Sequence, residues 1–235
     1  MTTFTYQERF KTLHGVFDEF TNRNLFELQS HHHFDELISP LFIGKESNVF
    51  LASKGPHKVI IKIYRMQNRE FKRMFQYIKQ DPRYENLKNK NRDIILAWTQ
   101  REYKNLLRAQ KYKLNTPQPL AIKNNILIIS LIGTDKPAPK LKDFTPSNPQ
   151  KLFQDIITQV KKLYHAELVH GDLSSFNILI HAHQPYLIDF SQSTLTKTPN
   201  SEELLKRDLN NLLQFFKKFS IKPDLAKTFK EITKK

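Results

Sequence analysis

The sequence has no cysteine, only five glycines and no long apolar run. Without cysteine it can form neither a disulfide framework nor a zinc site made of thiolates. The longest apolar run, 126–132, is interrupted by Ser130 and is far shorter than the roughly 20 residues that cross a bilayer. The first residues lack the basic and then apolar pattern of a signal peptide. These absences favour a cytoplasmic protein that has no contact with a membrane.

Acidic residues are scarce relative to basic ones. The chain has 38 Lys and Arg residues against 23 Asp and Glu residues, which gives a formal net charge of +15. Such an excess favours anionic partners, such as nucleic acid, phosphates or acidic surfaces. A proteome rich in lysine would produce the same excess, so charge alone does not decide between the two readings.

Two aspartates and an asparagine occur at a spacing that predicts phosphoryl transfer. Asp172 follows His170-Gly171, Asn177 comes five residues later, and Asp189 ends the next apolar run. Phosphoryl transfer needs a carboxylate near the attacking hydroxyl and oxygen ligands that hold Mg²⁺ on the phosphates of ATP. We therefore expect Asp172 to be catalytic and Asn177 and Asp189 to bind Mg²⁺, or Mn²⁺ in its place. A turn-capping or solvent-facing role would explain one aspartate, but not the whole set.

Lys62 lies in a run of aliphatic residues, where a lysine is costly unless it is paired. A kinase-type site has such a lysine on the α and β phosphates of ATP, paired with a glutamate from a helix. Glu102 is the best candidate for that glutamate, because Glu70 and Glu85 lie in a segment that we expect to be mobile. The alternative is a solvent-facing lysine on an amphipathic strand.

The segment 43–50 is the predicted phosphate loop, although it contains a single glycine. It matches neither the GxGxxG loop of ordinary protein kinases nor a P-loop. Gly44 would let backbone amides approach phosphate oxygens, Ser47 could donate its hydroxyl, and Lys45 adds positive charge. Taken alone this signal is weak and could be a plain turn, but its position ahead of Lys62 favours the loop.

Apolar residues three or four positions apart predict helices, and short runs of β-branched residues predict strands. The expected helices are 8–37, 94–112, 147–167 and 201–219, and the expected strands are 48–52, 58–64, 120–122 and 126–132. Glycine and proline at 133–139 predict a linker, and 65–93 is expected to hold a helix and a mobile loop.

This order of elements predicts an α+β fold of the bilobal protein-kinase type. We expect an N-terminal helical extension at 1–38, a small β-rich N-lobe with one key helix at 39–133, and a mostly helical C-lobe at 134–235.

The residues after Asp189 resemble those of one kinase family. Phe190-Ser191-Gln192 stands where ordinary kinases have Phe-Gly, and this is similar to the RIO family of atypical kinases. Other segments similar to the first RIO subfamily are spread over nearly the whole chain. They are 15–18, 34–37, 44–50, 77–78, 81–84, Trp98 with 101–106, 137–143, 207–208 and 215–216.

The resemblance implies a fold, an activity and a partner. It implies a Ser/Thr kinase that acts on itself or on artificial substrates, an ATPase activity, and a role in late maturation of the small ribosomal subunit, with the basic surface on pre-rRNA. It also implies that Asp189 accepts the phosphoryl group as an aspartyl-phosphate, with Asp172 assisting. Adenine would meet hinge backbone groups at Ser130 and Ile132.

Four positions depart from the family pattern. Phe42-Ile43 stands where the family usually has Ser-Thr, so hydroxyl contacts to phosphate are lost there. Ser130 replaces a usual Glu, and Gly171 replaces a frequent Ala. No core catalytic group is missing, so we expect an active protein that uses ATP. Since the sequence ends soon after its last expected helix, we also expect a minimal, archaeal-type form.

Two other functions fit parts of the sequence. A kinase of the tRNA-modification complex or a small-molecule phosphotransferase also has His-Gly-Asp-Leu followed by Asn, but Ser191-Gln192 and 81–84 argue against both. A non-catalytic switch that binds rRNA and ATP without turnover is also open. The sequence identifies neither the phosphorylated substrate nor which of the kinase and ATPase activities dominates.

Overall fold

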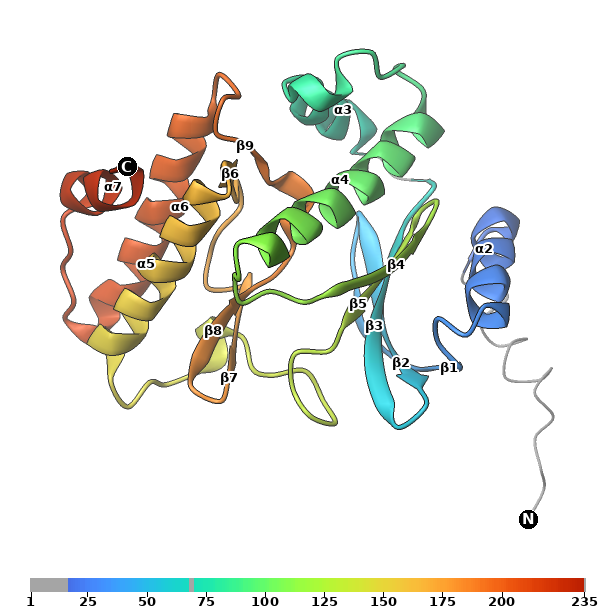
Figure 1. Ribbon diagram of the computed structural model, residues 1–235, viewed down its shortest axis with the longest axis horizontal. Helices are drawn as coiled ribbons and strands as arrows, with labels where there is room; N and C mark the ends of the chain where they lie inside the picture. The colour runs from blue at the N-terminus through green and yellow to red at the C-terminus, as the bar shows by residue number, and fades with distance from the viewer. Residues whose placement is uncertain (1–16, 68–69, 235) are drawn as a thin grey trace.

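The computed structural model describes residues 17–67 and 70–234, which form two lobes (Figure 1). The first lobe contains a five-stranded antiparallel sheet with the strand order β1-β2-β3-β5-β4. Its strands are β1 (Glu36–Ile43), β2 (Ser47–Lys54), β3 (His57–Tyr64), β4 (Pro119–Lys123) and β5 (Ile126–Ser130). Helix α2 (Glu19–Ser30) packs on one face of this sheet, and α4 (Asn91–Lys111) crosses beside the other.

The regular pairing of β2 with β3 decides which side chains face α2. These strands pair without a shift from Ser47↔Tyr64 to Lys54↔His57, so successive side chains alternate between the two faces. Phe50 and Ile61 are directly opposite each other and pack against Leu25 of α2. We call this side the outer face. Lys62, which is next to Ile61 in the chain, is therefore directed to the opposite side, the inner face.

The second lobe is mostly helical and contains α5 (Pro149–His165), α6 (Ser201–Phe216) and α7 (Leu225–Thr233). Two short strand pairs lie beside these helices: β6 (Leu168–Val169) with β9 (Thr194–Leu195), and β7 (Ile178–His181) with β8 (Gln184–Leu187). The rings of Phe153 and Phe216 meet edge to face at 5.2 Å in the core between α5 and α6. Burying a Phe side chain stabilises a fold by roughly 1.5–3 kcal/mol, so this contact helps to fix the two helices.

Short elements join the longer helices and strands. Helix α3 (Phe71–Lys79) and the 3-10 turn η1 (Pro82–Tyr84) lie between β3 and α4. The other 3-10 turns are η2 (Leu141–Asp143), η3 (Phe190–Gln192) and η4 (Lys217–Phe219). Met74 and Ile78 of α3 are buried against Trp98 of α4, which anchors α3 near the junction of the lobes.

The structure supports most of the expected elements and corrects three. Helices are present at α4, α5 and α6, and strands at β2 to β5. The expected helix 8–37 is wrong at its C-terminal end: α2 stops at Ser30, and β1, which begins at Glu36, extends the sheet. Its residues 8–16 lie outside the described residues. The helix expected at 201–219 ends at Phe216 and continues as η4, and α7 was not expected.

Two facts bear on the boundaries and on membranes. The expected division between residues 38 and 39 falls inside β1, so we propose a boundary before that strand. In the part of the chain that the structure describes, every helix is too short or too polar to cross a membrane.

Candidate active site

Lys62 of β3 lies at the centre of a group of charges on the inner face. Its Nζ is 3.0 Å from Glu102 Oε2 of α4 and 2.8 Å from Asp189 Oδ1, which comes after β8. The side chains of Lys62 and Glu102 are 9% and 2% exposed, whereas that of Asp189 is 40% exposed. The structure therefore brings the predicted Lys62–Glu102 pair together, and the Asp189 carboxylate is its solvent-facing end.

Tyr64 completes this group. It comes two residues after Lys62 and is on the same face of β3. Its hydroxyl donates a hydrogen bond to Glu102 Oε2, and Lys62 Nζ lies 5.1 Å from the centre of its ring. We call Lys62, Tyr64, Glu102 and Asp189 the ion-pair cluster.

Mutual pairing keeps the ion-pair cluster charged. Burial works against the Lys62 ammonium, but Asp189 and Glu102 outweigh it and raise the pKa of Lys62 well above its usual range. Burial also opposes ionisation of Asp189, yet Lys62 and a hydrogen bond from Ser191 lower the pKa of Asp189 to about 2. Burial raises the pKa of Glu102, and Lys62 counteracts this effect. The cluster thus presents an ionised carboxylate beside a cation.

A left-handed backbone turn directs the Asp189 side chain toward Lys62. Asp189 has φ 63° and ψ 71°, a region that aspartate tolerates better than most residues. Ser191 Oγ, in the η3 turn that follows, donates to Asp189 Oδ1 at 2.8 Å. Asn105 of α4 donates to two carbonyls of this turn, at 3.1 and 2.8 Å. Since Lys62 and Ser191 both bind Oδ1, Oδ2 is the oxygen that can bind a metal or a phosphoryl group.

Asp172 and Asn177 contact each other in the loop between β6 and β7. Asn177 Nδ2 donates to Asp172 Oδ2 at 3.2 Å and to the Asp172 carbonyl at 2.8 Å. The Asn177 carbonyl accepts from the N–H of Ile188 at 3.0 Å, which ties this loop to the residue before Asp189. Burial and the Asp189 charge raise the pKa of Asp172. A carboxylate of raised pKa is a better proton acceptor, as the predicted role of Asp172 requires.

Asp208 of α6 fixes the backbone on both sides of Asp172. Its Oδ2 accepts from the N–H of Gly171 at 2.7 Å, and its Oδ1 accepts from the N–H of Leu173 at 2.8 Å. The residue is 1% exposed. Burial raises the pKa of Asp208 to about 7 although the two N–H groups favour its charged form.

His170 supports the same loop from the other side. Its Nε2 lies 3.0 Å from the Ile188 carbonyl, and its ring lies 5.1 Å from that of Phe190. Burial lowers the pKa of His170 to about 4, so the ring is neutral at pH 7. These contacts give His170 a structural role in the loop. We call Asp208 and His170 the loop-supporting residues.

Gly44, Lys45 and Ser47 lie at the turn from β1 to β2. The N–H of Gly44 donates to the Ser47 carbonyl at 3.0 Å, and a Cβ at Gly44 would lie 2.5 Å from Cε1 of Phe42. A larger residue at position 44 would therefore require the exposed ring of Phe42 to move. Ser47 is buried and is opposite Tyr64 in the sheet, whereas Lys45 is exposed. The predicted phosphate loop is thus next to the ion-pair cluster.

Ser130 and Ile132 lie at the end of β5, away from the charged groups. Leu127 of β5 is opposite Lys62, and Ser130 follows three residues later, which is about 10 Å along a strand. The Ile132 carbonyl accepts from the N–H of Ala138 at 2.8 Å. A base contact at Ile132 would therefore use its N–H.

The donor atoms of the site suit a nucleotide with a magnesium ion. Mg²⁺ prefers oxygen ligands and retains phosphate and water in its shell. Asn177 uses Nδ2 for Asp172, which leaves its Oδ1 for a metal, and Asp189 offers Oδ2. Among residues 17–67 and 70–234, no cluster of three His, Asp or Glu residues could hold a metal alone. Phosphate oxygens of a substrate would have to supply the remaining ligands.

Three residues of the site have contacts that the sequence did not reveal. Tyr64, Ser191 and Asp208 each bond to a predicted site residue or to the loop that carries one. Two signals were available. Tyr64 is two positions from Lys62, and strand alternation puts both on one face. Asp208 interrupts the apolar stripe of α6 beside Leu209, where an aspartate needs a polar partner.

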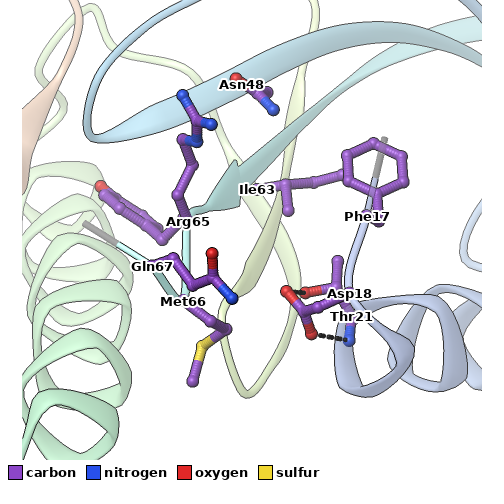
Figure 2. Close-up of a pocket in the computed structure, with 9 residues that line it drawn as sticks. Phe17, Asp18, Thr21, Asn48, Ile63, Arg65, Met66 and Gln67 are labelled. Carbon is purple, nitrogen blue, oxygen red and sulfur yellow. Dashed lines mark hydrogen bonds between the residues drawn. The ribbon is translucent and has the colours of Figure 1, made fainter. Parts of the chain in front are cut away.

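A separate pocket of about 260 Å³ lies on the outer face of the sheet. Figure 2 shows it between Asp18 and Thr21 at the start of α2 and the side chains of Ile63 and Met66. The predicted site residues do not line it. Tyr64 of the ion-pair cluster does line it, so the pocket reaches the end of β3 beside that cluster.

The chain matches known proteins along most of its length. A family model described as the RIO domain matches residues 48–231. The Rio1 protein of Methanocaldococcus jannaschii, a RIO-type serine/threonine-protein kinase, is 40% identical over 232 residues, which are 98% of this chain and 80% of that protein. The corresponding protein of Haloferax volcanii is 36% identical and covers 90% of this chain and 73% of its own length. Human RIO1 is 33% identical, and the match spans 38% of the human protein.

Solved structures match the fold. A Rio2 kinase–ADP/Mg²⁺–phosphoaspartate complex from Chaetomium thermophilum superposes with a TM-score of 0.69 at 20% identity. The match covers 90% of this chain and 66% of that one. A second structure of the same kinase gives the same TM-score at 21% identity. The expected kinase-like α+β fold is therefore confirmed.

Proposed function

The chain belongs to the RIO family of serine/threonine kinases, as its motifs predict, and on this premise we propose that it is an ATP- and Mg²⁺-dependent kinase and ATPase. Family membership confirms the predicted enzyme class, a phosphotransferase. The observation that carries the proposal is the contact of Lys62 with both Glu102 and Asp189, next to the Asp172–Asn177 pair.

Each group of the site has a role in this proposal. Lys62, held by Glu102, binds the α and β phosphates of ATP. Asn177 Oδ1 and Asp189 Oδ2 would hold Mg²⁺, which would neutralise charge on the phosphates. Asp172, with its raised pKa, orients and deprotonates an attacking hydroxyl or water. The exposed Lys45, in the turn from β1 to β2, adds positive charge for the phosphates.

We propose Asp189 as a phosphoryl acceptor in the ATPase reaction. A carboxylate oxygen of Asp189 forms a bond to the γ-phosphorus while the bond to the β–γ bridging oxygen breaks, and ADP leaves. Water, deprotonated at Asp172, then cleaves the aspartyl-phosphate to phosphate and carboxylate. The low pKa of Asp189 supports this role, because the nucleophile is ionised at neutral pH. The phosphoaspartate in the Rio2 complex is a parallel in a relative of the same fold.

The test is to incubate the protein with γ-labelled ATP and Mg²⁺. Label that hydroxylamine removes, and that Asp189→Ala abolishes, would support the aspartyl-phosphate. Acid-stable label on Ser or Thr would support protein kinase action, including phosphorylation of the chain itself. Asp135→Ala is the matched control, because its side chain is 88% exposed and pairs with Lys58. ATP binding without label or phosphate release would contradict both activities.

We propose that the chain works in the cytoplasm in late maturation of the small ribosomal subunit, with pre-rRNA as its partner. The net charge of +15 supports a polyanionic partner, and the exposed basic residues around 88–92 are one place for it to bind. The test is the labelling reaction with and without a small-subunit precursor. Two results together would contradict this role: ATP turnover that is the same with and without the precursor, and no binding of the precursor to the protein at 0.15 M salt or lower.

A further inference from the structure

Asp81 and Arg83 form an ion pair at the η1 turn, between α3 and α4. The segment 81–84 is one of those that resemble the RIO family, and the proposed reaction uses none of its residues. Asp81 is fully buried, whereas the side chain of Arg83 is 23% exposed. A buried carboxylate is costly unless it is paired, so Asp81 needs the arginine. The arginine has donors beyond those that Asp81 uses.

The Asp81 carboxylate fixes the plane of the Arg83 guanidinium. Arg83 Nε donates to Asp81 Oδ1 at 2.9 Å, and Nη2 donates to Oδ2 at 2.6 Å. The backbone N–H of Arg83 also donates to Oδ1, at 3.1 Å. Burial opposes ionisation of Asp81, but these bonds and the arginine charge outweigh it and lower the pKa of Asp81. Because the guanidinium is planar and two of its nitrogens bind one carboxylate, Nη1 is directed away from that carboxylate.

The free end of the Arg83 guanidinium decides how the Asn105 amide is oriented. Arg83 Nη1 donates to Asn105 Oδ1 at 2.9 Å, and Asn105 is fully buried in α4. With Oδ1 facing Arg83, Nδ2 donates to the carbonyls of Phe190 and Ser193 at 3.1 and 2.8 Å. In the reverse orientation the amide would place its donors against Arg83 and its oxygen against two carbonyls. Arg83 therefore selects the orientation that holds the η3 turn.

The η3 turn carries the metal-binding carboxylate of the site. It begins directly after Asp189, and Ser191 Oγ within it donates to Asp189 Oδ1. A shift of the turn would therefore move Asp189 Oδ2, the oxygen available to a metal. Glu102 is three residues before Asn105 and lies on the same side of α4. This helix thus holds Lys62 through one side chain and the η3 turn through the other.

We propose that Arg83 is a positioning residue for Mg²⁺ binding, and that it acts through Asn105 and the η3 turn on Asp189. This inference rests on the proposed function, because it requires that Asp189 binds Mg²⁺ together with ATP. Lys62 keeps its pair with Glu102 when Arg83 is changed, so contacts between Lys62 and the phosphates of ATP remain. Metal affinity and ATP affinity without metal are therefore expected to respond differently.

The test is the substitution Arg83→Lys. A lysine keeps a positive charge for Asp81, but its single ammonium lacks the rigid fork that reaches Asn105 at the same time. We expect ATP binding with Mg²⁺ to weaken about tenfold, the lower end of the loss when a partner behind a metal ligand is changed. ATP binding in EDTA should equal that of the wild type. Isothermal titration calorimetry measures both affinities, and kcat for phosphate release should also fall about tenfold.

Arg108→Lys is the matched control. Arg108 is also in α4 and also bonds to a carboxylate, that of Glu167, and to a backbone carbonyl, that of Ala166, but these contacts lie outside the site. This variant should keep both ATP affinities and the kcat of the wild type. If the two arginine variants lost Mg²⁺-dependent binding equally, or if Arg83→Lys lost as much affinity in EDTA as with Mg²⁺, a general loss of stability would explain the result and the inference would be overturned.

Asn105→Ala shows whether Arg83 acts through Asn105. This change removes both bonds to the η3 turn, so it should weaken ATP binding with Mg²⁺ at least as much as Arg83→Lys does. The double variant should then match Asn105→Ala alone, whereas losses that add would overturn the inference. A wild-type chain without Mg²⁺-dependent ATP binding would overturn the proposed function, and this inference with it. Mg²⁺-dependent binding that is the same in the wild type and in Arg83→Lys would overturn this inference alone.

Discussion

Two groups of ionisable side chains support the site, and they are held in different ways. The ion-pair cluster joins Lys62 of the sheet to two carboxylates at 2.8 and 3.0 Å, so Lys62 and Asp189 remain charged. The loop-supporting residues, Asp208 and His170, bond mainly to backbone groups. Burial moves their pKa values toward neutral forms, to about 7 and about 4.

The difference shows two uses of polar groups in a protein interior. Removing the two charges of an ion pair from water costs desolvation free energy, and the attraction between the charges offsets that cost. The charge is then available to a substrate. A buried side chain bonded to the backbone, with its pKa shifted toward the neutral form, fixes the shape of a loop at a lower desolvation cost than an ion pair. Changing one residue in each group separates these two effects.

The largest effect is expected from removing the cation of the ion-pair cluster. We expect Lys62→Met to lower turnover by on the order of 10³, since a preorganised charge at the transferred phosphates is lost. Glu102 can take a proton in this variant, because its pKa is already raised. The circular dichroism spectrum should therefore match that of the wild type, and phosphate release is the measurement.

Lys58→Met is the matched control for Lys62→Met. Lys58 is on the same strand, but its partner Asp135 is on the surface, and such pairs contribute about 0–1 kcal/mol. We expect Lys58→Met to turn over ATP as the wild type does. Turnover of Lys62→Met within tenfold of the wild type would remove the ion-pair cluster from the mechanism.

Asp208→Asn tests the loop-supporting residues through the pH dependence of stability. The folded pKa of about 7 is above that of an unfolded aspartate, so the wild type loses stability as the pH rises from about 4 to about 7. Asparagine does not titrate, so the variant should gain stability relative to the wild type by about 4 kcal/mol over this range. Urea unfolding at several pH values measures the difference. If the difference in unfolding free energy between the variant and the wild type did not change with pH, Asp208 would be ionised over the whole range from pH 4 to pH 7.

His170→Gln is expected to have a somewhat smaller effect, of opposite sign. The folded pKa of about 4 is below that of a free histidine, so the unfolded state binds the proton first. The stability gained by keeping His170 neutral is complete above pH 6.5, and about 3 kcal/mol of it is lost as the pH falls to 4. Glutamine should remove this loss and keep a donor for the Ile188 carbonyl. His57→Gln, at an exposed position, should follow the wild-type curve.

The sequence made some residues of the site easy to predict and left others hidden. Lys62, Asp172 and Asp189 follow patterns of local spacing and of charge inside apolar runs, which are visible without a structure. The pairing of Lys62 with Glu102 across 40 residues was inferred from the expected layout of the elements. The loop at Gly44 was a weak signal until its position relative to Lys62 was considered.

The remaining features depend on contacts that no local pattern contains. Asp208 bonds to a loop 35 residues earlier, and its role follows only from the packing of α6. The bulge at Leu41 is a shift of one residue, which strand propensity does not reveal, yet it decides the face of Phe42. The end of α2 and the start of β1 were misplaced for a related reason: pairing with β2, and not helical periodicity, determines residues 36–43.

The smallest effect is expected at Tyr64, where one hydrogen bond of the ion-pair cluster can be removed alone. Tyr64→Phe keeps the ring beside the Lys62 ammonium but removes the donor to Glu102 Oε2. A hydrogen bond to a charged group contributes about 1.5–3 kcal/mol. Because Lys62 still pairs with Glu102 in this variant, we expect turnover to fall about tenfold. The KM for ATP should change less, because the charge that binds phosphate is still present.

Tyr84→Phe gives the matched comparison for this last substitution. The Tyr84 hydroxyl is also buried, but it has no hydrogen-bond partner among the described residues. Removing it should leave turnover unchanged and should not lower stability. If both variants lose the same activity, Tyr64 acts only through general packing. If Tyr64→Phe alone lowers turnover, the hydroxyl positions Glu102, and the charged state of the ion-pair cluster depends on a neutral donor as well as on its ions.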